Sequence, residues 1–512
     1  MAADNYDVAI VGFGPSGAIA AALLGQAGVN VYVCDRAHDV YDKPRAIALD
    51  HEILRVFQHL GIGEEVAQYC EPFTDSCYFG LDGQMIRRMT VVPEPYPQAH
   101  QPSVVFTQPP VEAVLRRRIA ALPSVTVDTG LKLEALQQGS DDVTLTLKAE
   151  NGTHKTVTAR YLIGCDGASS TVREQVGLTL QDLDFDEPWL VVDVVANEQG
   201  LAKLPTTSVQ YCEPERPCSF VMGPGNHRRW EISLKPDEDP VQAATPEGAW
   251  RLLERWIGPA DAQLWRQASY RFHALVAEHW RVGRVFIAGD AAHQQPPFLG
   301  QGMCQGVRDV SNLIWKLQAV LDGRVRGQAA EALLDSYSTE RKEHVRQLTT
   351  TIKSVGAVIC ERDLAKARAR DTRLLDEQGG SVRPTPRQDI LPRLTTGLLA
   401  DSPAAGSLFP QPWLLKEGTR QRMDDVLGGG WRLVVTDPDL GLDAHLQAIT
   451  GMQRVVLGSP MLTEADGLLA AWFARHNVTA AIVRPDHYVY ATAAGVGPLV
   501  TLQRELLHRL TA

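Results

Sequence analysis

Residues 6–17, YDVAIVGFGPSG, decide the fold. The β-branched run YDVAIV at 6–11 predicts a strand, and a glycine-rich turn with Gly12, Gly14 and Gly17 follows it. The next residues, AIAAALLGQAG at 18–28, have a helical pattern, and a second apolar run, VNVYVCD at 29–35, ends in Asp35. The stretch therefore predicts a strand, a turn, a helix and a second strand, which is the start of an α/β fold with parallel strands.

The spacing of the glycines points to a dinucleotide. They permit a tight turn and a close approach of the backbone, while the helix amides and the positive end of the helix dipole favour a pyrophosphate. Asp35 ends the second strand, where it can bind the ribose hydroxyls, and the adjacent Arg36 is included in the predicted site. This motif alone does not distinguish FAD from a nicotinamide cofactor.

Two later motifs make that distinction. Residues 164–173 read GCDGASSTVR and residues 287–306 read IAGDAAHQQPPFLGQGMCQG, and each follows an apolar run. In this order the three motifs resemble those of the class A flavoprotein monooxygenases, the group of p-hydroxybenzoate hydroxylase and phenol hydroxylase, over about the first 350 residues. The resemblance implies FAD as cofactor, NAD(P)H as reductant, O2 as co-substrate and oxygen transfer through a flavin C4a-hydroperoxide.

The resemblance also implies roles for single residues. Asp166 and Gly167 match the family's DG motif, which contacts the FAD pyrophosphate indirectly and helps to admit the nicotinamide. Asp290 matches the aspartate that binds the ribityl chain, and Arg45 matches an early arginine beside FAD. Gln108 matches a glutamine that contacts the ribityl and phosphate region.

The segment with Pro297, Gly300, Gly302 and Met303 precedes a helical pattern. A helix that begins near Gly302 would point its amide end at a reduced flavin, which carries negative charge around N1 and C2=O. The glycines would let the isoalloxazine approach the backbone. We therefore predict that these residues contact the flavin.

Within the family, four segments are most similar to the 3-(3-hydroxyphenyl)propionate hydroxylase branch: GQGMCQGVRDVSNLIWKL, RRWEISL, LFPQPW and VRPDHYVY. This similarity implies a small phenolic acid as substrate. A larger aromatic polyketide, a non-oxygenating FAD oxidoreductase and a flavin-binding protein without catalysis are the alternatives. No catalytic base is assigned, because His51 and His293 are isolated histidines near the motifs and Ile47 stands where phenol hydroxylase has its aspartate.

The pattern of elements predicts a discontinuous FAD-binding domain of Rossmann type over residues 1–74, 104–180 and 276–325. An antiparallel-sheet substrate domain over 75–103 and 181–275 interrupts it. A helical segment over 326–378 and a Pro/Gly-rich linker over 379–412 follow, and a thioredoxin-like domain over 413–512 ends the chain. In the substrate domain, Arg229 and Glu231 fall on one face of a strand that would form a cavity wall, with a surface ion pair as the alternative.

The net charge of −11 argues against a nucleic-acid partner. The eight cysteines show no CxxC pair and no metal-ligand spacing, so we expect free thiols and no metal site. No cysteine follows Cys360, which excludes dithiol chemistry in the C-terminal domain and leaves packing and oligomer contact, with a homodimer as the expected assembly. The N-terminal strand and the lack of long apolar stretches predict a cytoplasmic protein without a membrane partner.

Overall fold

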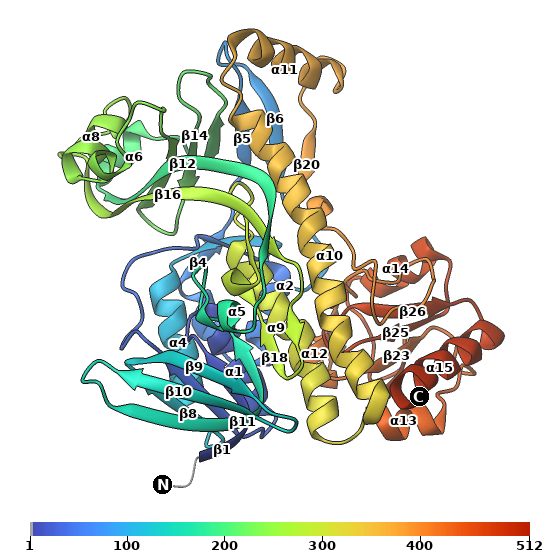
Figure 1. The fold of residues 1–512 in the computed structure, drawn as a ribbon. Helices are drawn as coiled ribbons and strands as arrows, with labels where there is room; N and C mark the ends of the chain where they lie inside the picture. The colour runs from blue at the N-terminus through green and yellow to red at the C-terminus, as the bar shows by residue number, and fades with distance from the viewer. Residues whose placement is uncertain (1–3) are drawn as a thin grey trace.

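The strand–turn–helix–strand unit predicted at the N-terminus is confirmed in the computed structural model, which describes residues 4–512 (Figure 1). β1 (Asp4–Val11) pairs in parallel with β2 (Val31–Asp35), and α1 (Pro15–Gln26) connects them. On its other side β1 pairs in parallel with β11 (His154–Gly164). The loops after β1 and β11, which hold two of the three motifs, therefore start at the same edge of the sheet.

The third motif starts at this edge too. β18 (Val285–Ile287) is parallel to β11 and leads into the short 3-10 helix η1 (Gly289–Ala291). α1 packs against α4 (Gln108–Ala120) and α9 (Gly302–Leu321). The strand order is β17-β18-β11-β1-β2-β8, and β10 and β9 extend the sheet as antiparallel strands beside β11. The strands not yet described are β17 (Arg281–Val282), β8 (Val125–Thr129), β9 (Leu131–Gln138) and β10 (Val143–Ala149).

A nine-stranded second sheet stands above the first in Figure 1. It is mostly antiparallel, as expected, but the pairs β13 with β5 and β20 with β6 are parallel, so the sheet is mixed. The long strands β12 and β16 reach from this sheet down to the first domain. The order is β19 (His293–Gln294), β16 (Ala262–Ala277), β12 (Leu180–Ala196), β15 (His227–Ser233), β14 (Cys218–Met222), β13 (Ser208–Tyr211), β5 (Ser76–Phe79), β6 (Met85–Thr90) and β20 (Pro384–Pro386).

Smaller elements complete these two parts. A three-stranded sheet has the order β3 (Ala48–Asp50), β7 (Ser103–Phe106) and β4 (Cys70–Pro72). Asp50 caps the helix after β3, because its carboxylate accepts from the backbone amides of Glu52 and Ile53. The short helices are α2 (His51–His59), α3 (Gly63–Ala67), α5 (Thr171–Gln175), α6 (Glu198–Lys203), α7 (Pro240–Ala243) and α8 (Pro246–Leu253).

The helical pattern after residue 326 forms α10 (Gly327–Ile359) and α11 (Leu364–Asp376). α10 runs along both sheets, and α11 lies at its far end (Figure 1). The stretch 379–412, expected to be a linker, supplies β20 at the edge of the second sheet and the 3-10 helix η2 (Arg387–Ile390). The first part of the stretch therefore belongs to the substrate side, whereas Leu398 and Ala400 pack in the hydrophobic cluster of the C-terminal part. The domain boundaries given above stay predictions.

The C-terminal part has a four-stranded sheet in the order β24 (Gln453–Val456), β23 (Arg432–Val435), β25 (Ala480–Val483) and β26 (Val489–Ala493). β23 and β24 are parallel and joined by a helix, and β25 and β26 form a hairpin before the last helix. The thioredoxin-like label stays a prediction. The remaining elements are β21 (Trp413–Lys416), β22 (Thr419–Arg422), α12 (Met423–Leu427), α13 (Ala444–Thr450), α14 (Leu468–His476) and α15 (Val496–Thr511).

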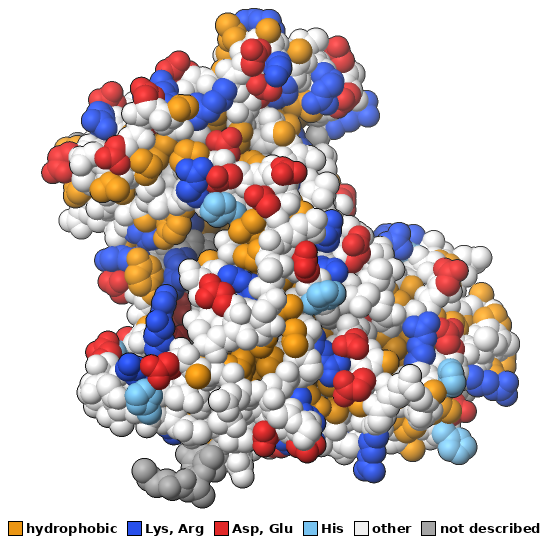
Figure 2. Space-filling view, in the orientation of Figure 1, with side chains coloured by type: hydrophobic (Ala, Val, Ile, Leu, Met, Phe, Trp, Pro, Cys, Tyr) orange, Lys and Arg blue, Asp and Glu red, His pale blue; other side chains and the backbone are white. Residues whose placement is uncertain are grey.

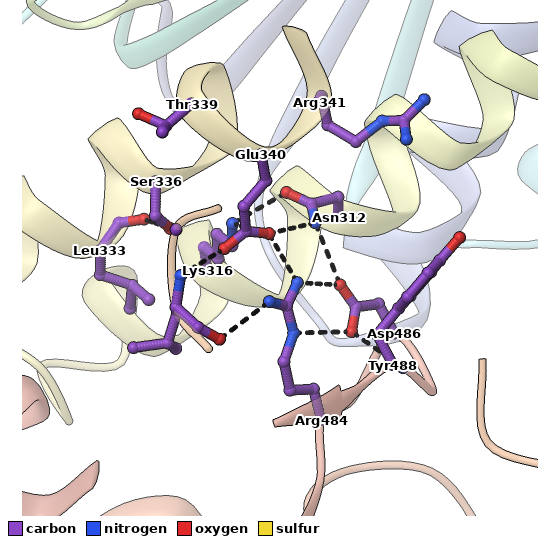
Figure 3. A network of polar contacts seen from close by, with 12 residues as sticks. Asn312, Lys316, Leu333, Ser336, Thr339, Glu340, Arg341, Arg484, Asp486 and Tyr488 are labelled. Carbon is purple, nitrogen blue, oxygen red and sulfur yellow. Dashed lines mark hydrogen bonds and ion pairs between the residues drawn. The ribbon is translucent and has the colours of Figure 1, made fainter. Parts of the chain in front are cut away.

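A buried polar network joins this C-terminal part to α9 and α10 (Figure 3). Glu340 of α10 contacts Arg484 at 2.7 Å and Lys316 of α9 at 2.9 Å, and Asn312 bridges Glu340 and Asp486. One hydrophobic cluster surrounds the junction, with Trp315 of α9 packed edge-on against a tryptophan of the C-terminal part. The C-terminal part is thus fastened to the helix whose first residues belong to the third motif.

On the face shown in Figure 2, acidic and basic side chains are interspersed over all three parts. In the part of the chain that the structure describes, no helix is long and apolar enough to cross a membrane.

Candidate active site

The three glycines of the first motif differ in their surroundings. A Cβ at Gly12, whose φ is +103°, would lie 2.3 Å from the carbonyl oxygen of Cys165, and a Cβ at Gly17 would lie 2.0 Å from that of Gly12. A Cβ at Gly14 would meet nothing within 4 Å. Gly12 and Gly17 therefore let the chain pack, whereas Gly14 opens the turn to a cavity. No side chain caps α1, so its first amides are available to a ligand there.

This cavity, of about 360 Å³, lies where the first and second sheets face each other. Nine of the fourteen predicted site residues line it, namely Gly14, Arg45, Gln108, Gly167, Asp290, Pro297, Gly300, Gly302 and Met303. Gly12, Gly17, Asp35, Arg36 and Asp166 are not among its lining residues. A cavity of this size with a few polar groups is typical of a small-molecule site.

Two of the residues outside the cavity support its wall. Asp35 accepts from the backbone amides of Phe13 at 2.5 Å and Ala37 at 2.7 Å, so it holds the glycine turn against the end of β2. Asp166 accepts from the Ser170 hydroxyl at 2.5 Å and from the Val172 amide at 3.1 Å, so it shapes the loop that presents Gly167. Arg36 is exposed.

Asp290 lines the cavity, and its side chain is exposed there. Burial raises the pKa of this carboxyl, and the nearby His293 and Arg45 act in the opposite direction. A carboxylate that is exposed to the cavity can accept hydrogen bonds from the hydroxyls of a ligand. It stands at the carboxyl end of β18, where open α/β sheets bind ligands.

The predicted start of the helix after the third motif is confirmed, because α9 begins at Gly302. No side chain caps it, and Gly300 has a φ of +62°, a conformation that favours glycine. Asp309 in the second turn fixes the helix by accepting from the Gly289 amide at 2.9 Å, His293 at 2.7 Å and Arg341 at 2.9 Å. The positive end of α9 therefore points at the cavity from a fixed position.

His293 is thus a structural residue, and His51 is buried outside the cavity lining. Neither isolated histidine belongs to the cavity wall.

The segment with Arg45 is held from two sides. Gln108 accepts from the Ala46 amide at 2.5 Å and donates to Glu112 at 2.6 Å. Arg229 of β15 donates to the Arg45 carbonyl at 2.7 Å. The sheet domain and the first domain are therefore connected directly at the cavity.

The surface ion pair considered for Arg229 and Glu231 is wrong. Both side chains are buried and line the cavity, and Arg229 instead pairs with Asp193 of β12 at 2.7 Å. Burial alone would raise the pKa of Asp193, but Arg229 and His227 lower it. The predicted common face is confirmed, because Arg229 and Glu231 both point to the cavity.

Sequence reasoning did not find several wall residues. Gln210 of β13 and Ser219 of β14 lie beside Glu231 in one cross-strand row, and the Ser219 hydroxyl donates to Gln210. Arg387 of η2 lies 4.1 Å over the Phe73 ring and donates to the Leu299 carbonyl at 2.8 Å. No local pattern marks these residues, because contacts between distant segments bring them together, such as the pairing of β13 with β14 and of β20 with β6.

The comparisons with known proteins agree with this architecture. A family model described as "FAD binding domain" matches residues 5–351, and a model described as "HcaD C-terminal domain" matches residues 406–504. The chain belongs to the FAD-dependent aromatic hydroxylase family. This hydroxylase is 35% identical to a "Probable NADH-specific resorcinol 4-hydroxylase" of Rhodococcus jostii (strain RHA1), over 98% of the chain and 94% of the relative.

Two further relatives extend the comparison. A "3-(3-hydroxy-phenyl)propionate/3-hydroxycinnamic acid hydroxylase 2" of Burkholderia vietnamiensis is 32% identical over 97% of the chain and 96% of the relative. A crystal structure of aklavinone-11 hydroxylase with FAD and aklavinone is 23% identical, covers 100% of this chain and 99% of that one, and has a TM-score of 0.79. That likeness shows the fold.

The residues present fit FAD. The hydroxylase offers the uncapped start of α1 for a pyrophosphate, the cavity-facing carboxylate of Asp290 for ribityl hydroxyls, and the uncapped start of α9 for the anionic side of a reduced isoalloxazine. All three open into one cavity.

Proposed function

We propose that this hydroxylase adds one oxygen atom from O2 to the ring of a small phenol that carries an anionic side chain, with NAD(P)H as reductant. The observation that carries the substrate class is Arg387. This guanidinium lines the cavity, and no carboxylate lies within ion-pair distance of it among residues 4–512. Arg387 is half-buried without a carboxylate partner, and this partial burial lowers the pKa of its guanidinium. A carboxylate on the substrate supplies that partner.

The names of the relatives support a small phenol. The Burkholderia relative is named for two phenolic acids, and the Rhodococcus relative is named for resorcinol, a neutral phenol. Arg387 favours the phenolic acid, and resorcinol is the second candidate. A larger polyketide has less support, since the likeness to aklavinone-11 hydroxylase concerns the fold.

FAD, when bound, supplies hydride acceptance from the nicotinamide and the activation of O2. We infer that Asp290 accepts hydrogen bonds from the ribityl chain and that the Gly14 turn binds the pyrophosphate. Gly300, Gly302 and Met303 would lie against the isoalloxazine, with the α9 amides stabilising its negative charge. Phe73, Phe298 and Leu299 line the substrate side with apolar surface and keep water out.

The other predicted roles remain part of this proposal. Asp35 and Arg36 would lie near the adenosine end of FAD, and Asp166 would act on the nicotinamide through the loop that carries Gly167. A homodimer is the proposed assembly, and sedimentation of the holoenzyme tests it.

Stopped-flow reduction by NADH and by NADPH, with 3-(3-hydroxyphenyl)propionate, resorcinol or no phenol, tests the reaction. We expect the phenolic acid to accelerate flavin reduction and to leave with one atom from ¹⁸O2. If no phenol accelerates reduction and aerobic turnover yields only hydrogen peroxide, the proposal is wrong. If resorcinol is hydroxylated and the phenolic acid is not, the function stands and the anionic substrate class is wrong.

A further inference from the structure

The second sheet presents one free carboxylate to the cavity. Glu231 of β15 is 6% exposed, lines the cavity, and has no hydrogen-bond partner for its side chain among the described residues. Asp193 of the neighbouring strand β12 already contacts Arg229 and His227, each at 2.7 Å. Buried carboxylates are almost always hydrogen-bonded, so an unpartnered one that faces a cavity indicates a ligand group that donates to it.

The neighbours of Glu231 cannot supply that donor. Ser219 stands opposite Glu231 on β14, and Gln210 stands opposite Ser219 on β13. The Ser219 hydroxyl has one proton, which it donates to the Gln210 amide oxygen. Arg229 has its guanidinium directed to Asp193 and to the carbonyls of Pro44 and Arg45. The donor must therefore come from within the cavity.

Glu231 and the cationic Arg387 lie at different places along the cavity wall. Arg387 lies over Phe73, just before β5, whereas Glu231 is on β15, and β14 and β13 lie between these strands. Three strand spacings place the backbones of β15 and β5 roughly 14 Å apart. Glu231 and Arg387 therefore stand at different ends of this stretch of the cavity wall, as the phenolic and acidic ends of one substrate would require. The two charges thus suit the two ends of one such molecule.

We propose that Glu231 is the catalytic base that takes the proton of the substrate's phenolic hydroxyl, an inference that rests on the proposed function. The O–H bond breaks, the proton moves to the Glu231 carboxylate, and the electron pair stays on the phenolic oxygen. From there it increases the electron density of the ring carbon that is oxygenated. When that carbon later releases its own proton to water, the electron pair of the broken C–H bond returns to the ring, the oxygen takes a proton back from Glu231, and the carboxylate is regenerated.

The electrostatic surroundings suit this role. Burial raises the pKa of Glu231 to about 7, Arg229 and Arg266 act against that rise, and Asp193 adds to it. The other titratable groups near it are Cys218 on β14 and, along the cavity, Arg45, Asp290 and Arg387. A general base is most effective when its pKa lies near the working pH.

The test compares the FAD-loaded wild type with Glu231→Gln, which keeps the shape and removes the base. Glu134→Gln is the matched control, because Glu134 is an exposed residue of β9 that contacts Lys148 and His154. The first readout is the near-ultraviolet difference spectrum of bound 3-(3-hydroxyphenyl)propionate from pH 5 to 9. The second is the pH profile of product formation, and the third is the rate of flavin reduction by the nicotinamide that the wild type uses.

We expect the wild type and Glu134→Gln to show a phenolate band that grows as pH rises through about 7, with product formation rising in parallel. In Glu231→Gln the phenolate band and the rise of product formation with pH should disappear. Product formation should fall by about 10²–10⁴-fold, the usual contribution of a general base. Flavin reduction should change less than product formation, so more peroxide is released per NAD(P)H. Glu231→Asp, which retains a carboxylate, should restore part of the phenolate band.

An unchanged phenolate band and pH limb in Glu231→Gln, with product formation within about twofold of wild type, would overturn the assignment. The assignment would also be overturned if Glu231→Gln and Glu231→Asp lose product formation equally, with normal FAD content and an unshifted pH profile. Such a result indicates that Glu231 has a packing role. If the wild type itself hydroxylates no phenol, the proposed function fails instead, and the two failures are distinguishable.

Discussion

Arg484 of the C-terminal part lies 2.7 Å from Glu340 of α10, and both side chains are fully buried. The same guanidinium contacts Asp486 at 2.5 Å, so two carboxylates share one arginine, with Lys316 of α9 as the second cation. Figure 3 shows Arg484 between the two acids. α9 starts at the cavity with Gly302 and Met303 and passes through this network. The contacts with the C-terminal part therefore help to hold these two residues in position.

Arg484→Met should therefore destabilise the enzyme strongly. Removing one partner of a buried ion pair costs about 3–5 kcal/mol, because the remaining charges stay buried without compensation. Arg373→Met, which breaks the exposed pair with Glu377, should cost less than about 0.5 kcal/mol. Denaturant unfolding of both variants measures the difference, and similar losses would contradict the buried-network account.

The same network should make the enzyme sensitive to acid. Burial alone would raise the pKa of Glu340, but Arg484 and Lys316 lower it well below its usual value of 4.5. Its contribution to stability is therefore present above the usual pKa and is lost as pH falls below it. We expect the melting temperature of the wild type to fall faster below pH 4.5 than that of Glu340→Gln, as measured by calorimetry. If the melting temperatures of the wild type and of Glu340→Gln fall in parallel with pH, the ionised Glu340 contributes nothing to stability.

The glycine turn gives a matched pair of substitutions. Gly17→Ala places a methyl group 2.0 Å from the Gly12 carbonyl oxygen, so it should disturb the turn and reduce stability. At Gly14 a methyl group meets no protein atom within 4 Å, and the φ of −75° suits alanine. Gly14→Ala should therefore fold normally and yet bind FAD more weakly, as shown by circular dichroism and by FAD titration. Normal FAD affinity in Gly14→Ala would place the pyrophosphate elsewhere.

Asp290→Asn tests the proposed contact with the ribityl chain. Hydrogen bonds to a charged group contribute about 1.5–3 kcal/mol, so the Kd for FAD should rise roughly 10- to 100-fold. Asp141→Asn, in an exposed turn, is the control. Fluorescence quenching of FAD on binding to the apoprotein provides the measurement, and an unchanged Kd would exclude Asp290 from the flavin site.

Arg387→Gln tests the choice between a phenolic acid and a neutral phenol. Loss of the cation should raise KM for 3-(3-hydroxyphenyl)propionate by roughly 10- to 100-fold, again from about 1.5–3 kcal/mol, while KM for resorcinol should change little. Arg383→Gln, at an exposed position in the same segment, should leave both values unchanged. Equal effects on the acid and the neutral phenol would show that Arg387 does not bind a carboxylate.

The sequence by itself determined the nucleotide-binding half of this protein. Gly12, Gly14 and Gly17 stand between a strand and a helix, and Asp290 and Gly302 lie in another local motif, so short-range constraints on the backbone were enough to predict them. The parallel pairing of β1, β2 and β11 followed because such strands carry uninterrupted apolar runs. It also fixed the edge of the sheet at which the motifs meet.

Only the tertiary structure decided the substrate side. Alternation along residues 227–233 predicted that Arg229 and Glu231 share a face. It could not show that Asp193 pairs with Arg229 and that the Glu231 carboxylate is left without a partner among the described residues. Arg387 is far from every motif in the chain, and it reaches the cavity because β20 adds to the edge of the second sheet. Charge partners and cross-strand neighbours are set by pairing between distant segments, and a local sequence pattern carries no record of that pairing.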